Sequence, residues 1–158
     1  MTKISEHVAY SEVIRSDTAK RKGIKNNPSD IQLERIKLFA EKVFEPLRNY
    51  IGVPIFISSC FRSKALNKAI GGASSSQHMA NNGAAMDLDA DIFKGVTNKE
   101  IFDYIKDNLD FDQLIIENVG KDGTGGWIHV SYKEFNNRKE VLRMTIKNGK
   151  STYTKYQQ

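Results

Sequence analysis

The sequence predicts a single α+β domain in which helices pack against a mostly antiparallel sheet. Its 158 residues are a usual length for one domain, and no internal repeat or change of composition marks a second one. Patterns typical of helices mostly precede patterns typical of strands. That order is typical of α+β domains.

The first part of the chain is expected to be helical. Residues 8–22 are consistent with a short helix, and the sequence KGIKNNPSD behind it is typical of a loop. Ser29 and Gln32 have the spacing of a capping box, which predicts the start of a long helix. Pro46 is expected to bend or end this helix. The apolar residues of its buried stripe are Ile36, Phe39, Ala40, Val43 and Leu47.

The middle of the chain is predicted to contain two strands with a helix between them. VPIFISS at 53–59 is rich in β-branched residues, which favours a buried strand. Residues 63–70 favour a short helix that ends at Gly71-Gly72. AAMDLDAD at 84–91 alternates apolar and acidic residues, so its carboxylates would share one face of a strand.

The last part of the chain is predicted to be mainly strand. Thr97 and Glu100 repeat the capping-box spacing before one more helix. Three strands follow, at 112–117, 127–132 and about 140–147, and the Gly-rich loop GKDGTGG joins the first two as a hairpin. We expect residues 1 to about 28 to form an N-terminal arm and residues from about 148 to 158 to form a polar tail that frays.

Composition limits the possible partners and locations. The net charge is +5, but the basic residues are scattered and form no nucleic-acid-binding motif, so no nucleic-acid partner is expected. No run approaches the ~20 apolar residues of a membrane-spanning helix. The early charges of the N-terminus leave no apolar core for a signal peptide, so we expect synthesis in the cytoplasm without an export signal. The lone Cys60 excludes an internal disulfide and any site made of several thiolates.

Histidine and aspartate residues in three segments favour a metal site. The chain has three histidines, of which His78 precedes the acidic strand and His129 lies within the strand GWIHVSY. The third, His7, lies in a charged N-terminal stretch and is left out. Catalytic zinc usually takes three His or carboxylate ligands. His129 and either Asp87 or Asp89 could supply two of them from separate strands, and His78 could supply the third from the adjoining loop. The same acidic strand is also consistent with a solvated edge or with a hard cation held by oxygens.

Several motifs in order extend this argument. SSCFRSKALNKAIGGASSSQH, GAAMDLD and GWIHVSY resemble motifs of the zinc D-Ala-D-Ala carboxypeptidase and L-alanyl-D-glutamate endopeptidase family, and most of all its short phage-type branch. The resemblance extends nearly from the N-terminus to Tyr132. It implies the Hedgehog/DD-peptidase fold and a zinc peptidase that hydrolyses peptide bonds of bacterial peptidoglycan, an endolysin-type enzyme of a phage or prophage. We expect a monomer that acts on the cell wall after release or as part of a virion. The resemblance also implies that His78, Asp87 and His129 hold one zinc ion.

The resemblance implies roles for further residues. Arg62 matches the arginine that holds a substrate carboxylate or carbonyl oxygen, and Ser76 matches a serine that helps to position the substrate. Many relatives carry the catalytic acid three residues before the last histidine ligand, and that position here is Gly126. Glu117 is then the candidate general base. If it pairs opposite Trp127 in the hairpin, it is a diagonal neighbour of His129 on the same face.

Alternatives remain open at several positions. Asp122 could replace Glu117 as the base, and Glu117 could be a solvated carboxylate at the end of a strand. Four residues, MANN, separate His78 from the next glycine where the family usually has two, so Asp89 stays a rival to Asp87.

A further departure is that Cys60 and Phe61 replace the family's usual glycine and tyrosine before Arg62. Cys60 could be activated by that arginine or simply be a small buried residue. The departures also leave room for a non-catalytic wall-binding or virion module with the same fold.

Overall fold

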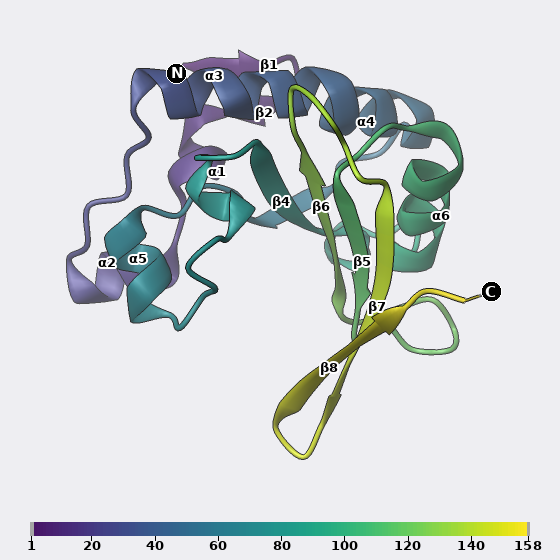
Figure 1. The fold of residues 1–158 in the computed structure, drawn as a ribbon. Helices are drawn as coiled ribbons and strands as arrows, with labels where there is room; N and C mark the ends of the chain where they lie inside the picture. Colours follow the sequence, from purple (N-terminus) through teal and green to yellow (C-terminus); the bar gives the residue numbers. More distant parts are fainter. Residues whose placement is uncertain (1, 158) are drawn as a thin grey trace.

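The computed structural model of the chain describes residues 2–157. A six-stranded sheet with the order β3-β4-β6-β5-β7-β8 forms its centre (Figure 1). The strands are β3 (Phe56–Ser59), β4 (Ala84–Asp89), β5 (Gln113–Glu117), β6 (Trp127–Tyr132), β7 (Glu140–Lys147) and β8 (Lys150–Lys155). Neighbouring strands are antiparallel except β5 and β7, which are parallel. The predicted α+β class with a mostly antiparallel sheet is confirmed.

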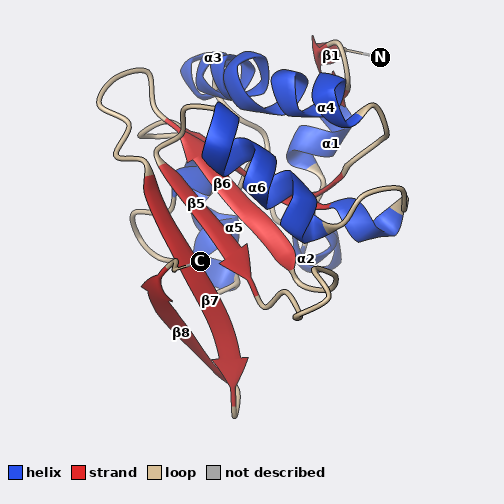
Figure 2. Cartoon of the chain, turned by 90° about the vertical axis from the view of Figure 1, so that its right-hand side faces the viewer, coloured by secondary structure: helices blue, strands red, loops and turns tan. Residues whose placement is uncertain are grey.

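Helices cover one face of this sheet, as Figure 2 shows for α3, α4 and α6. The helical segments are α1 (Tyr10–Ile14), α2 (Asp17–Lys22), α3 (Asp30–Phe39), the π-helical η1 (Ala40–Phe44), α4 (Glu45–Ile51), α5 (Lys64–Ala69), the 3-10 turns η2 (Gln77–Met79) and η3 (Ala90–Ile92), and α6 (Asn98–Asn108). A small separate sheet pairs β1 (Lys3–Ser5) with β2 (Val8–Ala9).

Strand periodicity separates a core face of the sheet from a polar face. Along β4 the core face carries Met86 and Leu88, both fully buried, and Asp87 lies between them. Along β6 Ile128 and Val130 are fully buried in the same way and His129 lies between them. Because successive side chains of a strand point to opposite faces, Asp87 and His129 project from the face away from the core.

Both predicted capping boxes are present. The Ser29 hydroxyl accepts a hydrogen bond from the backbone N–H of Gln32, and the Gln32 side chain accepts one from the Ser29 backbone. Thr97 and Glu100 repeat this arrangement at the start of α6. These bonds satisfy donors that every helix start leaves free, and such a cap typically contributes about 1 kcal/mol.

The expected single helix over residues 8–22 is wrong. Val8 and Ala9 pair as β2, and the rest divides into α1 and α2. Arg15 between the two helices has an extended backbone, and its guanidinium donates to the carbonyl of Ile57 at 2.6 Å. Ser16 then caps α2 by accepting a hydrogen bond from the Ala19 N–H. The hydrogen bond from Arg15 to β3 therefore accompanies a break in the helix that the sequence pattern predicted.

The long helix does not end at Pro46. Helical structure continues from Asp30 to Ile51, and Pro46 lies in the first turn of α4 directly after the π-helical segment. In that segment the Glu45 N–H bonds to the carbonyl of Ala40, five residues back. A proline inside a regular helix removes one hydrogen bond and crowds the carbonyl four residues before it, and the wider π turn provides the room.

The polar tail was expected to fray, and for most of its length this is wrong. Lys150–Lys155 forms β8, antiparallel to β7, and the β7–β8 hairpin extends beyond the body of the molecule (Figure 1). Asn148 and Gly149 both have positive φ and connect the pair Lys147–Lys150 as a two-residue turn. Asn-Gly favours this turn geometry, which allows the polar tail to continue the sheet. Among residues 2–157, no helix combines the length and the apolar character needed to cross a membrane.

Candidate metal centre and active site

Two adjacent strands place Asp87 and His129 side by side. The register of β4 and β6 pairs the two residues directly, and their side chains leave the polar face of the sheet. The Asp87 Oδ1 oxygen lies 3.0 Å from the His129 Nδ1 nitrogen. The predicted common groove between two strands is therefore present for this pair.

His78 reaches the same point from the turn η2. Its Nδ1 lies 2.7 Å from the backbone carbonyl of Cys60, and its own carbonyl accepts a 2.9 Å hydrogen bond from the Arg62 N–H. Because a carbonyl only accepts, Nδ1 carries the proton and Nε2 presents its lone pair. That nitrogen lies 3.3 Å from Asp87 Oδ1. A hydrogen bond from the second imidazole nitrogen to a carbonyl is the usual way in which proteins orient a metal-binding histidine.

The cluster has the composition and spacing of a metal site. His78, Asp87 and His129 each offer one ligand atom, and these atoms all lie within 4.8 Å of one another. Burial disfavours the Asp87 carboxylate, but its interactions with the His78 and His129 imidazoles outweigh burial, so the pKa of Asp87 lies well below its usual value. Two imidazoles and one ionised carboxylate are a ligand set that zinc accepts while keeping a fourth position open.

The rival aspartate and the third histidine lie elsewhere. Asp89 Oδ1 accepts hydrogen bonds from the Asp91 N–H and from the amide of the buried Asn98. His7 Nδ1 lies 2.7 Å from a carboxylate oxygen of Glu45. Neither residue belongs to the group formed by His78, Asp87 and His129.

Arg62 and Ser76 both border this cluster. An Arg62 Nη2 nitrogen lies 3.5 Å from Asp87 Oδ2, and Arg62 Nε donates a long hydrogen bond to Ser59. The Ser76 oxygen accepts from the His78 N–H at 3.3 Å and so caps the turn that carries the histidine. Its hydroxyl proton is left to donate to a ligand.

Glu117 is a buried carboxylate at the end of β5. The pairing on which its predicted position depends is present, because Glu117 lies opposite Trp127 and the next residue on that face of β6 is His129. Burial and the negative charge of Asp87 raise the pKa of Glu117 to about 7, although His129, Trp127 and Arg62 oppose the rise. A carboxyl group with such a pKa can accept and release a proton near neutral pH.

Gly126 cannot be replaced by an acidic residue without a change of backbone. Its φ is +56°, and a Cβ atom there would lie 2.0 Å from the carbonyl oxygen of Glu117. Glu117 is therefore the immediate neighbour of the position that carries the acid in many relatives. Asp122, the other candidate, is exposed in the loop and binds Thr124.

These residues line one groove of about 890 Å³. We call the part around His78, Asp87, His129 and Glu117 its metal end. The part around Gln77, Asp112, Lys133 and Arg138, which also line the groove, is its lysine end. The two ends lie along β5, since Asp112 directly precedes this strand and Glu117 is its last residue.

Some residues of the site were not found by sequence analysis. The buried Asn26 donates to the carbonyls of Ile14 and Phe61 and accepts from the Ser63 N–H, so it fixes the backbone on both sides of Arg62. Its only signal in the sequence was a loop-like stretch. Tyr153 of β8, from the supposed tail, also lines the groove.

Cys60 is a buried small residue and not an activated thiol. Its side chain is buried, and burial together with the charges of Asp87 and Glu12 raises the thiol pKa far above its usual value. Its contribution to the site is the carbonyl that orients His78.

Comparison with known protein families agrees with this geometry. A sequence model of the peptidase M15 family matches residues 6–131. The chain belongs to the peptidase M15 family. M15 peptidases are zinc-dependent, and the His78–Asp87–His129 group lies within the matched region and could hold a metal ion. A search of curated proteins found no match.

Proposed function

We propose that this M15 peptidase is a zinc enzyme that hydrolyses peptide bonds in the stem peptides or cross-links of bacterial peptidoglycan. The observation that carries the proposal is the convergence of His78, Asp87 and His129 in a groove that also holds Glu117. The resemblance to phage-type enzymes further supports an endolysin-type role, with the chain acting on the cell wall as a monomer.

The three ligand residues would hold the zinc ion. When bound there, zinc supplies Lewis acidity, which polarises the scissile carbonyl and lowers the pKa of water. The carbonyl of Cys60 and the backbone of Arg62 hold His78 in place without any metal. The ligands are therefore largely preorganised, which reduces the cost of binding the ion.

Glu117 is the proposed general base. Its carboxylate takes a proton from the attacking water and returns it to the leaving amine. Proton transfer is most effective when the pKa of the group lies near the working pH, and burial gives Glu117 a pKa of about 7. Its position beside His129 and opposite Trp127 places it over the metal end of the groove.

Arg62 and Ser76 are the proposed substrate-binding residues. The guanidinium of Arg62 lies 3.5 Å from Asp87 Oδ2, so it reaches the metal end of the groove. Its planar fork of donors suits a carboxylate or carbonyl oxygen of the stem peptide, and a lysine could not reproduce it. The free hydroxyl proton of Ser76 is positioned next to His78 and can donate to the substrate backbone.

Digestion of purified peptidoglycan tests the proposal. The zinc-loaded protein, the chelator-treated protein and the protein with zinc restored are incubated with peptidoglycan, and released fragments are analysed by mass spectrometry. We expect new amino termini only in the two zinc-containing reactions, and their identity names the bond. Tight binding to peptidoglycan without any release, at full zinc occupancy and across several wall types, would instead indicate the non-catalytic binding module.

A further inference from the structure

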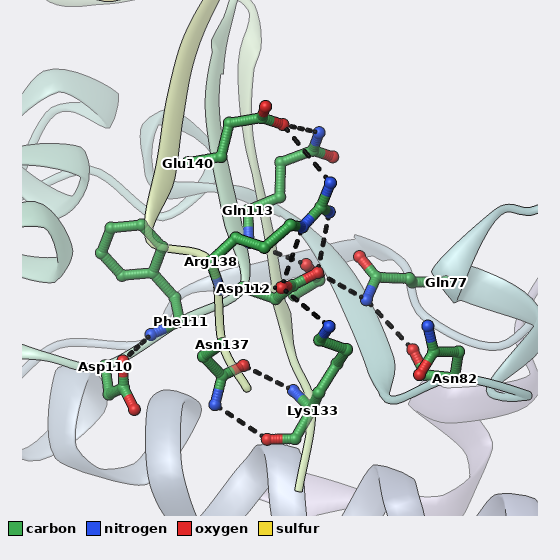
Figure 3. Close-up of polar contacts among 11 residues, drawn as sticks. Gln77, Asn82, Asp110, Phe111, Asp112, Gln113, Lys133, Asn137, Arg138 and Glu140 are labelled. Carbon is green, nitrogen blue, oxygen red and sulfur yellow. Dashed lines mark hydrogen bonds and ion pairs between the residues drawn. The ribbon is translucent and has the colours of Figure 1, made fainter. Parts of the chain in front are cut away.

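The lysine end of the groove is organised around one buried carboxylate. The Asp112 side chain is 1% exposed and accepts hydrogen bonds from Arg138 Nε at 3.1 Å, from Arg138 Nη2 at 2.8 Å and from the Arg138 backbone at 3.0 Å (Figure 3). Gln77 Nε2 donates a fourth bond at 3.0 Å. Arg138 and Gln77 alone therefore occupy the acceptor positions of this carboxylate.

Lys133 is a second cation beside the same carboxylate. Its Nζ nitrogen forms an ion pair with Asp112 Oδ1 at 3.5 Å (Figure 3). Its side chain is only 18% exposed. An ammonium group has three donors and loses hydration on burial, and the one oxygen that Lys133 approaches already accepts two hydrogen bonds from Arg138. A ligand that supplies a further acceptor would therefore stabilise the Lys133 ammonium.

The second carboxylate of this cluster, Glu140, does not pair with Lys133. Glu140 lies 3.9 Å from Arg138 Nη1 and accepts a 2.7 Å hydrogen bond from Gln113. Figure 3 shows Glu140 on the side of Arg138 away from Lys133. Arg138 thus bridges the two carboxylates, whereas Lys133 faces the groove that it helps to line.

We propose that Lys133 forms an anion subsite of the groove that binds a free carboxylate of the peptide substrate, away from the bond that is cut. The subsite rests on the proposed function, because it assigns part of the same peptide substrate to the lysine end of the same groove. One ammonium that already faces the negative Asp112 suits a singly charged carboxylate better than a doubly charged phosphate, because Asp112 repels the phosphate more strongly.

The position of Lys133 predicts where this carboxylate lies in the substrate. Lys133 follows the last residue of β6 and is four residues beyond His129. Four residues of extended strand span about 13 Å. Because the lysine side chain can also reach along the groove, we expect the bound carboxylate to lie about two to four residues of an extended peptide away from the metal end. Lys133 and Arg138 also lie beyond residues 6–131, so both cations of the subsite belong to the part of the chain outside the family match, whereas Asp112 and Gln77 lie within it.

Two stem peptides that differ at one group test the subsite. They are identical except that a non-terminal carboxylate is free in one and converted to the carboxamide in the other. With the zinc-loaded protein, we expect KM to be about tenfold lower for the free carboxylate, because a charge-assisted hydrogen bond is lost with the amide. If neither peptide is cleaved, the same ratio is measured as Kd by calorimetry, so failure of the proposed function stays distinct from failure of the subsite.

Lys133→Met then removes the cation and keeps most of the packing volume. We expect it to abolish the preference for the carboxylate with little change in kcat, and Lys133→Arg to restore part of the preference. Lys147→Met, at the exposed tip of the β7–β8 hairpin, removes the same charge elsewhere and should keep the preference. A wild-type protein without the preference, or a Lys133→Met variant that keeps it while only its thermal stability falls, would overturn the proposal.

Discussion

The two ends of the groove each contain a buried aspartate, but the partners of the two carboxylates differ. At the metal end, Asp87 faces His129 at 3.0 Å, His78 at 3.3 Å and Arg62 at 3.5 Å, and its side chain is 13% exposed. At the lysine end, Asp112 is 1% exposed and accepts four hydrogen bonds between 2.8 and 3.1 Å. Asp87 thus shares one oxygen between two imidazoles, while Asp112 has its acceptor positions filled.

This difference separates a proposed metal ligand from a scaffold residue. The pKa values of both carboxyls are lowered despite burial, because positive groups and donors surround each of them. Ionisation alone therefore does not distinguish the two ends. What distinguishes them is whether lone pairs remain free to bind something else, and by that criterion Asp87 can ligate a cation whereas Asp112 can only hold its neighbours in place.

Removal of the Asp87 charge should have the largest effect. Asp87→Asn keeps the shape of the side chain but removes the anionic ligand, so we expect zinc affinity to fall by more than about 100-fold. This exceeds the loss that is typical when a residue that only orients a ligand is changed. Activity should fall to the level of the metal-free protein. Zinc affinity is measured by competition with a chromophoric chelator.

Asp89→Asn is the matched control for this variant, since it changes the same charge two residues along the strand. Its zinc affinity should stay within about threefold of the wild-type value, because Asp89 bonds to Asp91 and Asn98 and not to the cluster. If Asp89→Asn lost zinc and Asp87→Asn kept it, the assignment of the ligand would be wrong.

The next effect in size concerns Glu117, which belongs to the metal end but is no ligand. Glu117→Gln should retain zinc and lower kcat by about 10²- to 10⁴-fold, the usual contribution of a general base. Asp122→Asn, in the adjacent loop, should leave kcat unchanged. An active Glu117→Gln variant would remove Glu117 from the mechanism.

The same residue predicts the pH dependence of the wild-type protein. Only ionised Glu117 can accept a proton, so kcat/KM should fall as the pH falls through its pKa, which is raised to about 7 in the metal-free protein. Bound zinc stabilises the carboxylate, so in the zinc-loaded protein this fall in kcat/KM should occur at a lower pH. The residual activity of Glu117→Gln should not show the fall, and a fall that persists in this variant would belong to another group.

At the lysine end, Asp112→Asn should affect stability and not zinc binding. Removal of the buried carboxylate leaves Lys133 without an anion and Arg138 with Glu140 alone. Because Arg138 is 52% exposed and water can partly replace its partner, we expect a loss of about 2 kcal/mol in the free energy of unfolding at pH 7. Asp110→Asn, an exposed neighbour, should cost less than about 0.5 kcal/mol. Urea unfolding followed by circular dichroism measures both variants.

The sign of the pH effect follows from the direction of the Asp112 pKa shift. Burial opposes ionisation, but hydrogen bonds from Arg138 and Gln77 lower the pKa to about 2, below its value of 3.8 in the unfolded chain. The stabilisation is therefore fully present above about pH 4 and is lost as the pH falls towards 2. The difference in stability between the wild-type protein and Asp112→Asn should shrink over that range, and a constant difference would contradict this explanation.

The metal end was largely predictable from sequence because it depends on strand periodicity. Alternation placed Asp87 and His129 on the polar faces of their strands, and a hairpin register was enough to bring Glu117 near His129. The choice between Asp87 and Asp89 was not predictable in this way, since both share a face. It depends on Asn98, which binds Asp89 from the start of α6.

The lysine end was not predictable, because it depends on side chains that meet only in three dimensions. Gln77, Asp112 and Arg138 come from a turn, the residue before a strand and a loop, and no periodic pattern connects them. The β7–β8 hairpin had a local signal in Asn148-Gly149, but the polar composition of the tail obscured it. The pKa of Glu117 likewise follows from burial, which the sequence around a strand end does not reveal.

Tyr153 should give the smallest effect, and it tests whether the segment beyond the family match contributes to the metal end. The sheet registers join Trp127, Glu117, Met144 and Tyr153 in one row across four strands, and Tyr153 lines the groove. Its side chain is 55% exposed, so Tyr153→Ala should change the free energy of unfolding by less than about 1 kcal/mol. Loss of an aromatic wall should still raise KM by about fivefold with kcat unchanged, which corresponds to about 1 kcal/mol. Tyr153→Phe keeps the ring and should behave like the wild-type protein, whereas an equal rise of KM in both variants would assign the effect to the hydroxyl. An unchanged KM in Tyr153→Ala would restrict the contribution of the C-terminal segment to the lysine end.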